Sequence, residues 1–155
     1  MIIPGGLIVG EVNTNTISSP GILATIAGGS DNHIQGTSNN STIGAGESNN
    51  INGATNSTIG AGRTNEIKQN VESSFVGGGD ANIISASFSS IVGGKNNTIS
   101  SPRSIIPGGT NNTINAGADY SFVAGQRGVV NNEGTFIWSD YSESYEYTQP
   151  WMNYD

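Results

Sequence analysis

A short motif that ends in glycine returns along this chain every 15 to 17 residues. Each repeat has a large apolar residue three positions before this glycine and another one five positions after it. The marker glycines are Gly29, Gly46, Gly62, Gly79, Gly94, Gly109 and Gly125. Self-similarity at a short fixed period is the signature of a solenoid, in which each repeat forms one turn and stacks on its neighbours. We call one such turn a rung.

The composition predicts strands and turns. The 155 residues include 19 Ile but only 2 Leu, together with 23 Gly and many Asn and Ser. Branched Ile favours strands, whereas Gly, Asn and Ser favour turns. We therefore predict an all-β, single-chain parallel β-solenoid, or β-roll, of about eight rungs. Residues 1–24 would form an N-terminal cap and a degenerate first rung, 25–140 the repeats with a closing segment, and 141–155 an aromatic tail.

Side-chain alternation along a strand predicts which residues point inward. Two large apolar residues, one Asn and the small residue just before the glycine would face a thin interior in each rung. The expected core ladder is Ile26, Ile43, Ile59, Val76, Ile91, Ile106, Phe122, Ile34, Ile51, Ile67, Ile84, Ile99 and Ile114. The expected Asn ladder, whose amides would bond the rungs above and below, is Asn32, Asn49, Asn65, Asn82, Asn97 and Asn112.

A core this thin predicts association. Two Ile per rung bury little area, while Gly-rich backbone loses much entropy when it is ordered. Phe75, Ile83, Phe88 and Ile105 fall outside the inner positions, so they could line a second core between chains. Oligomerisation is the usual remedy for a small core, and we expect the chain to partner itself.

Two repeats and the closing segment carry a family resemblance. Residues 41–51 (STIGAGESNNI) and 90–99 (SIVGGKNNTI) resemble the head repeats of trimeric autotransporter adhesins and of related phage and giant-virus tail or surface fibres. Residues 119–127 (DYSFVAGQR), followed by 134–140 (GTFIWSD), are similar to the closing rung of that family. The resemblance covers about residues 9–140.

The resemblance implies a left-handed β-roll, three chains packed side by side, and a role in adhesion. The partners would then be the other two chains and a host-surface receptor or glycan, at an extracellular or virion-surface location. The first residues lack the pattern of a signal peptide, so we expect either export by another route or a mature or truncated form.

Patterns that would indicate other chemistry are weak. We predict no catalytic residue, no cofactor and no metal site, because the Gly clusters recur in every rung and no acidic calcium-loop series does. The single histidine, His33, should point outward. A net charge of −7 with five scattered basic residues disfavours nucleic acid, and no run is long enough for membrane insertion.

Alternative functions remain open at this point. The chain could be a structural filament subunit that stacks end to end without a receptor. A row of Thr25, Thr42, Thr58 and Ser90 just before the inner Ile could bind ice, although Phe75 and Ile105 interrupt it. An enzyme would need acids clustered in a groove. The tail should dock on another chain through Tyr141, Tyr145, Tyr147, Trp151 and Tyr154.

Overall fold

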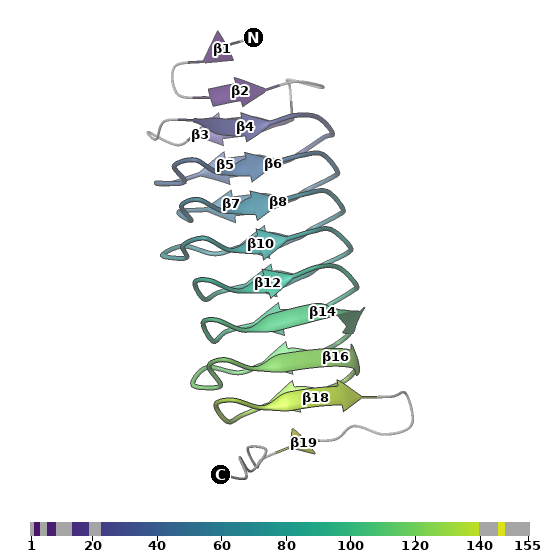
Figure 1. Ribbon diagram of the computed structural model, residues 1–155. Helices are drawn as coiled ribbons and strands as arrows, with labels where there is room; N and C mark the ends of the chain where they lie inside the picture. Colours follow the sequence, from purple (N-terminus) through teal and green to yellow (C-terminus); the bar gives the residue numbers. More distant parts are fainter. Residues whose placement is uncertain (1, 4–5, 9–13, 19–22, 140–145, 148–155) are drawn as a thin grey trace.

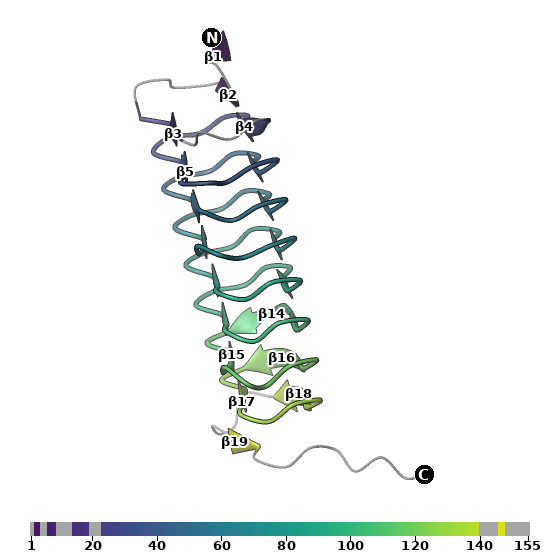
Figure 2. The same ribbon diagram turned by 90° about the vertical axis from the view of Figure 1, so that its left-hand side faces the viewer.

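The protein is a stack of short rungs that forms a rod, with the first strand at one end and the last strand at the other (Figures 1 and 2). The computed structural model describes residues 2–3, 6–8, 14–18, 23–139 and 146–147. Every secondary-structure element of these residues is a strand, and the strands form two sheets. The predicted all-β parallel solenoid of about eight turns is confirmed.

Sheet A runs along one side of the rod and contains ten strands. All neighbours in it are parallel except β1 and β2, which are antiparallel and end the sheet at the N-terminal tip. In spatial order its strands are β1 (Ile2–Ile3), β2 (Gly6–Ile8), β4 (Ala24–Ile26), β6 (Thr42–Ile43), β8 (Thr58–Ile59), β10 (Phe75–Val76), β12 (Ser90–Ile91), β14 (Ile105–Thr110), β16 (Phe122–Gln126) and β18 (Phe136–Ser139).

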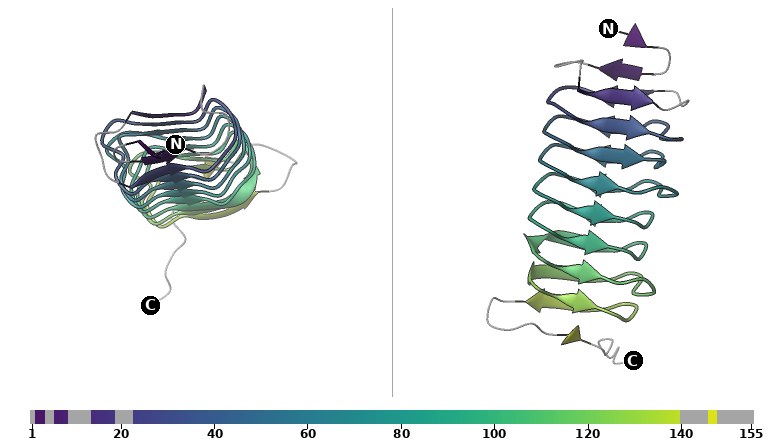
Figure 3. Two further views of the ribbon diagram at one scale, coloured as in Figure 1. Left: turned by 90° about the horizontal axis from the view of Figure 1, so that it is seen from above. Right: turned by 180° about the vertical axis from the view of Figure 1, so that it is seen from behind.

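Sheet B lies opposite and contains nine strands, all parallel to their neighbours. Figure 3, from above, shows the two sheets as facing sides of one flattened coil. In spatial order the strands are β3 (Thr16–Ser18), β5 (His33–Gln35), β7 (Asn50–Asn52), β9 (Glu66–Ile67), β11 (Ile83–Ile84), β13 (Thr98–Ile99), β15 (Thr113–Ile114), β17 (Val129–Val130) and β19 (Glu146–Tyr147).

The core consists of columns of branched side chains between the sheets. Ile43 pairs with Ile59 in sheet A and Ile51 with Ile67 in sheet B, so identical residues stack in register. Both columns are fully buried along nearly the whole rod. The turns that lead from sheet B back to sheet A add a third, smaller column, whose buried members include Ala54. Each rung thus gains apolar contacts mainly from the rungs above and below it.

The prediction that Phe122 belongs to the core ladder is wrong. Val123 occupies the inner position and is fully buried, while Phe122 pairs with Ile105 on the outer face. The physical reason is a β-bulge: the register between β14 and β16 shifts between Ile105 and Gly108. The seventh repeat has one residue fewer between its inner side chain and Gly125, so counting three residues back from the glycine reaches Phe122, one residue before the inner Val123.

The prediction that the small residue before each marker glycine faces the interior is also wrong. Ala61 is exposed, and a Cβ added to Gly93 would meet nothing within 4 Å. Crowding occurs instead at the marker glycine and along the rod axis. A Cβ on Gly46, whose φ is 103°, would lie 2.1 Å from the carbonyl oxygen of Gly62. Glycine is therefore required there by the neighbouring rung.

Repeat structure begins before residue 25. Strand β2 pairs in parallel with β4, with Ile8 opposite Ile26, and Asn15 is buried on the N-terminal side of the first complete rung. At the other end, β19 pairs in parallel with β17 of the same chain. Sheet B is therefore extended by a strand from the tail.

Candidate functional site

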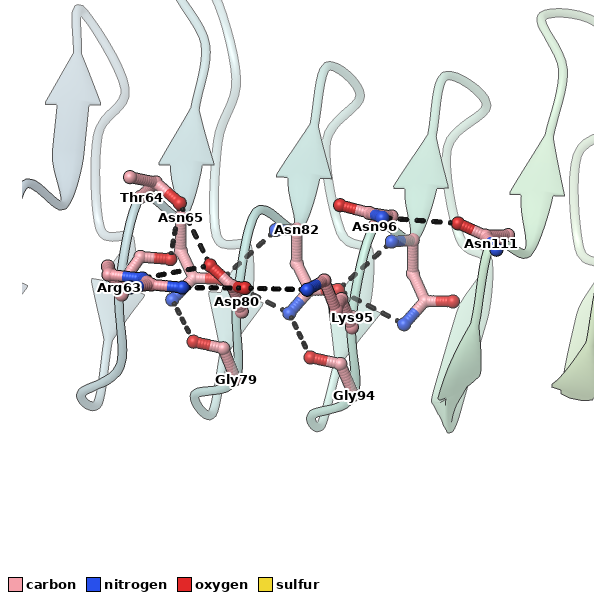
Figure 4. Close-up of polar contacts among 11 residues, drawn as sticks. Arg63, Thr64, Asn65, Gly79, Asp80, Asn82, Gly94, Lys95, Asn96 and Asn111 are labelled. Carbon is pink, nitrogen blue, oxygen red and sulfur yellow. Dashed lines mark hydrogen bonds and ion pairs between the residues drawn. The ribbon is translucent and has the colours of Figure 1, made fainter.

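The Asn ladder lies buried in the turns from sheet A to sheet B. In each rung the side-chain amide donates to the preceding Asn and to the marker glycine of the next rung (Figure 4). For Asn65, Nδ2 donates to Asn49 Oδ1 and to Gly79 O, both at 3.0 Å, and Oδ1 accepts from the backbone N–H of Asn82 at 3.0 Å. All six predicted residues have this placement: Asn32, Asn49, Asn65, Asn82, Asn97 and Asn112. Structural bonds therefore occupy these amides.

The ladder begins at Asn15 and ends at Gly128. Asn15 Nδ2 donates to Gly29 O at 2.7 Å, and Gly128 donates its backbone N–H to Asn112 Oδ1 at 2.9 Å. A Cβ on Gly128 would lie 2.6 Å from Val123 Cγ1. The bulged seventh rung therefore has no room for an Asn, because the shifted Val123 fills that space.

A second polar ladder, of serines, was not predicted from the sequence. It stands two residues before the inner residue of sheet A: Ser41, Ser57, Ser74, Ser89, Ser104 and Ser121, all buried. Ser41 Oγ accepts from the backbone N–H of Ser57 at 3.2 Å and donates to Ala54 O at 2.8 Å. The sequence does show Ser recurring two residues before the inner residue of sheet A. Ser is common in turns and also occurs in strands, so this recurrence alone did not indicate a buried ladder.

Charges of alternating sign occupy the position just after the marker glycine: Glu47, Arg63, Asp80 and Lys95. Asp80 lies between two cations, with Arg63 Nη2 at 3.1 Å and Lys95 Nζ at 3.3 Å (Figure 4). The hydrogen bond from Arg63 outweighs desolvation, which raises the pKa, and together with hydrogen bonds from Lys95 and Thr64 it lowers the pKa of Asp80 to about 2. If the stack skipped one rung, Glu47 would lie next to Asp80 or Arg63 next to Lys95. Like charges would then be neighbours, so the charges at this corner favour the observed register.

The outer face of sheet A changes character along the rod. Its column runs Thr42, Thr58, Phe75, Ser90, Ile105 and continues to Phe122 and Phe136. Thr25, Thr42 and Thr58 thus form a hydroxyl row only in the N-terminal half. In the C-terminal half, Phe75 is 41%, Phe136 49% and Trp138 75% exposed. The rings of Phe122 and Phe136 stack with centroids 4.7 Å apart.

An arginine lies between two aromatic rings beside this face. The Cζ atom of Arg103 is 5.7 Å from the ring centroid of Phe88 and 5.5 Å from that of Tyr120. The three residues occupy one position in successive rungs, two residues before the sheet A strand. Cation–π attraction holds such a guanidinium over the rings. We call this cluster the Phe-Arg-Tyr stack.

His33 lies on the outer side of β5. Its Nδ1 is 2.6 Å from Thr16 Oγ1 and its Nε2 is 3.3 Å from Asp31 Oδ1. Within the part of the chain that the structure describes, no group of three or more His, Cys, Asp and Glu side chains could hold a metal ion. Over the same residues, no helix has the length and hydropathy needed to cross a membrane.

Most of the predicted inter-subunit tail lies outside the described residues, namely Tyr141, Tyr145, Trp151 and Tyr154. The backbone of Tyr147 belongs to β19, where it pairs with Val130 of its own chain. This strand therefore covers the end of its own sheet B. Neither the comparison with protein-family models nor the search of curated proteins found a match for this chain.

Proposed function

We propose that this chain is one of three identical subunits of a β-solenoid fibre that attaches a virion or cell to a surface. The observation that carries the proposal is the apolar outer face of sheet A between Phe75 and Trp138. The resemblance of the repeats to the heads of trimeric autotransporter adhesins and viral fibres supports the number three and the adhesive role.

The size of this face fits an interface between subunits. Aromatic side chains bring ~150–250 Å² each, and Phe75, Phe136 and Trp138 leave two fifths or more of theirs in water. With Val92, Ile105 and Phe122 alongside, the face amounts to several hundred Å², against ~800 Å² per partner in a stable interface. Three rods that turn this face toward a common axis would bury it.

A column of small residues supports close approach of a second chain. The position before the marker glycine is small in every rung, yet a Cβ added to Gly28, Gly93 or Gly108 would meet nothing within 4 Å. The fold of one chain therefore gives no steric reason for glycine at these three positions. A neighbouring backbone that packs against this corner would supply one.

The mass of the assembly tests the subunit arrangement. Sedimentation equilibrium should give three times the chain mass of 15.9 kDa. The double variant Phe75→Thr and Phe136→Thr copies the residue that Thr42 and Thr58 place in the same column, so each rung should still fold while the trimer dissociates. Thr98→Ser on the outer face of sheet B is the matched control. A wild-type monomer, or a double variant that stays trimeric, would contradict the proposal.

Electron microscopy and adhesion assays test the role. The attachment proposal predicts discrete short rods that adhere to cells or to immobilised surface extracts, with adhesion competed by soluble protein. Long fibres that show no saturable adhesion would instead favour a structural filament whose subunits stack end to end.

A further inference from the structure

One backbone position recurs with a positive φ in every turn that leads into sheet A, along the left edge of the rod in Figure 1. Asn and Gly adopt this left-handed conformation readily, whereas larger side chains do so at a cost. Among the described residues, this position is occupied by Leu23, Asn40, Asn56, Ser73, Phe88, Arg103, Tyr120 and Gly134. The backbone therefore does not explain why Phe, Arg and Tyr replace Asn in three consecutive rungs.

The three replacements form the Phe-Arg-Tyr stack, which leaves hydrogen-bonding capacity at the surface. The Arg103 guanidinium carbon lies within 6 Å of both ring centroids, and the guanidinium N–H groups are the donors that this cluster can offer. No carboxylate of the described residues forms an ion pair with Arg103, in contrast to Arg63, which Asp80 engages at 3.1 Å. Arg103 is thus an exposed cation held between two rings, with donors that a ligand can reach.

The rings have accessible surface on the sides turned away from Arg103. Phe88 is 51% and Tyr120 58% exposed. The next residues in the column are Ser73 above Phe88 and Gly134 below Tyr120, both too small to cover a ring. The two rings lie two rungs apart, a distance of ~10 Å. This spacing suits an extended ligand with apolar patches on both sides of a central anionic group.

We propose that the Phe-Arg-Tyr stack is a binding site for a saccharide that bears a carboxylate, such as a sialic or uronic acid. The inference rests on the proposed attachment function and names its receptor chemistry. The guanidinium fork matches a carboxylate in a two-point hydrogen bond, and the rings accept the C–H faces of neighbouring sugars. A single arginine on a chain of net charge −7 selects against polyanions such as nucleic acid or heavily sulfated glycans.

The test is direct binding of defined sugars to the full chain. Ligand-observed NMR and calorimetry would compare 3′-sialyllactose and a galacturonate oligomer with lactose and with the sialyllactose methyl ester, which lacks the charge. Arg103→Gln should weaken binding of the acids at least tenfold. Arg127→Gln is the matched control, because Arg127 is exposed and has a φ of 59° but lies at a different corner.

Phe88→Asn and Tyr120→Asn separate binding from folding. Asn suits the left-handed backbone, so the melting temperature should stay equal or rise while sugar binding falls.

The inference is overturned if no carboxylated sugar binds, if the methyl ester or a sulfated sugar binds equally well, or if Arg103→Gln binds like wild type. Sedimentation of the same samples keeps the two proposals distinguishable: a trimer without sugar binding refutes this site alone, and a sugar-binding monomer refutes the trimer alone. If Arg103→Gln dissociates the trimer, the stack belongs to the subunit interface and the inference fails.

Discussion

Replacement of Asn65 by Ala removes one member of the buried ladder in the middle of the rod. Nδ2 of Asn65 bonds Asn49 Oδ1, Ala61 O and Gly79 O at 3.0 to 3.2 Å, and Oδ1 accepts from the backbone N–H of Asn82. The variant leaves that N–H without its acceptor, at ~1–3 kcal/mol, and loses the net stabilisation of the remaining bonds, ~0.5–1.5 kcal/mol each. We expect the free energy of unfolding to fall by about 3–5 kcal/mol per chain.

Urea and thermal unfolding followed by circular dichroism measure this loss. For a chain of this length the melting temperature should fall by about 10 °C. Asn50→Ala is the control, because Asn50 lies next to the ladder on the outer face, where its Oδ1 accepts one bond from Gln35 Nε2 at 3.2 Å. Its expected cost is below ~1 kcal/mol. If both variants melt alike, the ladder amides do not stabilise the stack.

The variant Asn65→Asp keeps the acceptor oxygen of the side chain but removes its Nδ2 donor, so it tests the two roles separately. The carboxylate keeps an oxygen for the N–H of Asn82 but turns its other oxygen toward Asn49 Oδ1, Ala61 O and Gly79 O, which are all acceptors. Burial beside oxygens raises the pKa of a carboxyl group in the folded state. The variant should therefore be least destabilised below the unfolded pKa and lose stability as the pH rises. An equal loss at pH 4 and pH 8 would show that the site admits water.

Three further predictions concern the stack. Gly62→Ala, at a φ of 99° and with Gly79 O 2.3 Å from the new Cβ, should cost about 2–4 kcal/mol in urea unfolding, whereas Gly93→Ala, whose new Cβ meets nothing of its own chain, should cost less than ~1 kcal/mol when the dissociated chain unfolds. Asp80→Asn should lower the melting temperature above pH 4; since the pKa of Asp80 is lowered to about 2, its contribution is lost as the pH falls from 4 through 2, and a difference that keeps its full size at pH 2 would contradict this. Deletion of residues 141–155 removes β19 and should reduce assembly or cause aggregation; unchanged sedimentation and melting would show that the tail is dispensable.

The interior was largely predictable because each rung imposes the same demands on the next. A side chain between two rungs must match both, so Ile, Asn and Gly recur at fixed offsets that counting reveals. Phe122 was wrongly assigned to the core because the seventh repeat has one residue fewer before its marker glycine. The missing residue moves the inner position by one, while the order of residue types still looks regular. The alternating charges at Glu47, Arg63, Asp80 and Lys95 were equally countable, one residue after each marker glycine, and only their pairing needed the structure.

The outer columns were harder to predict, because solvent places no demand on them. In the column that ends the turn into sheet A, Asn40 and Asn56 suit the left-handed backbone conformation, whereas Phe88, Arg103 and Tyr120 adopt it at a cost. A sequence pattern shows only that the position varies. The left-handed φ and the ring contacts show that the variation runs against local preference in three consecutive rungs.

This contrast is why we propose that the function lies on the outer surface of the C-terminal half. The interior repeats with little change as far as the bulged seventh rung, so it does little to distinguish one half of the rod from the other. The outer face of sheet A does distinguish them, since hydroxyl groups at Thr42 and Thr58 give way to rings at Phe75 and Phe136. One repeated sequence pattern is enough to build the scaffold. Surface residues that differ from this pattern cost stability or solubility unless a partner or ligand binds there. The apolar face and the Phe-Arg-Tyr stack are two such departures on neighbouring columns, which is why we assign one to subunit contact and the other to a ligand.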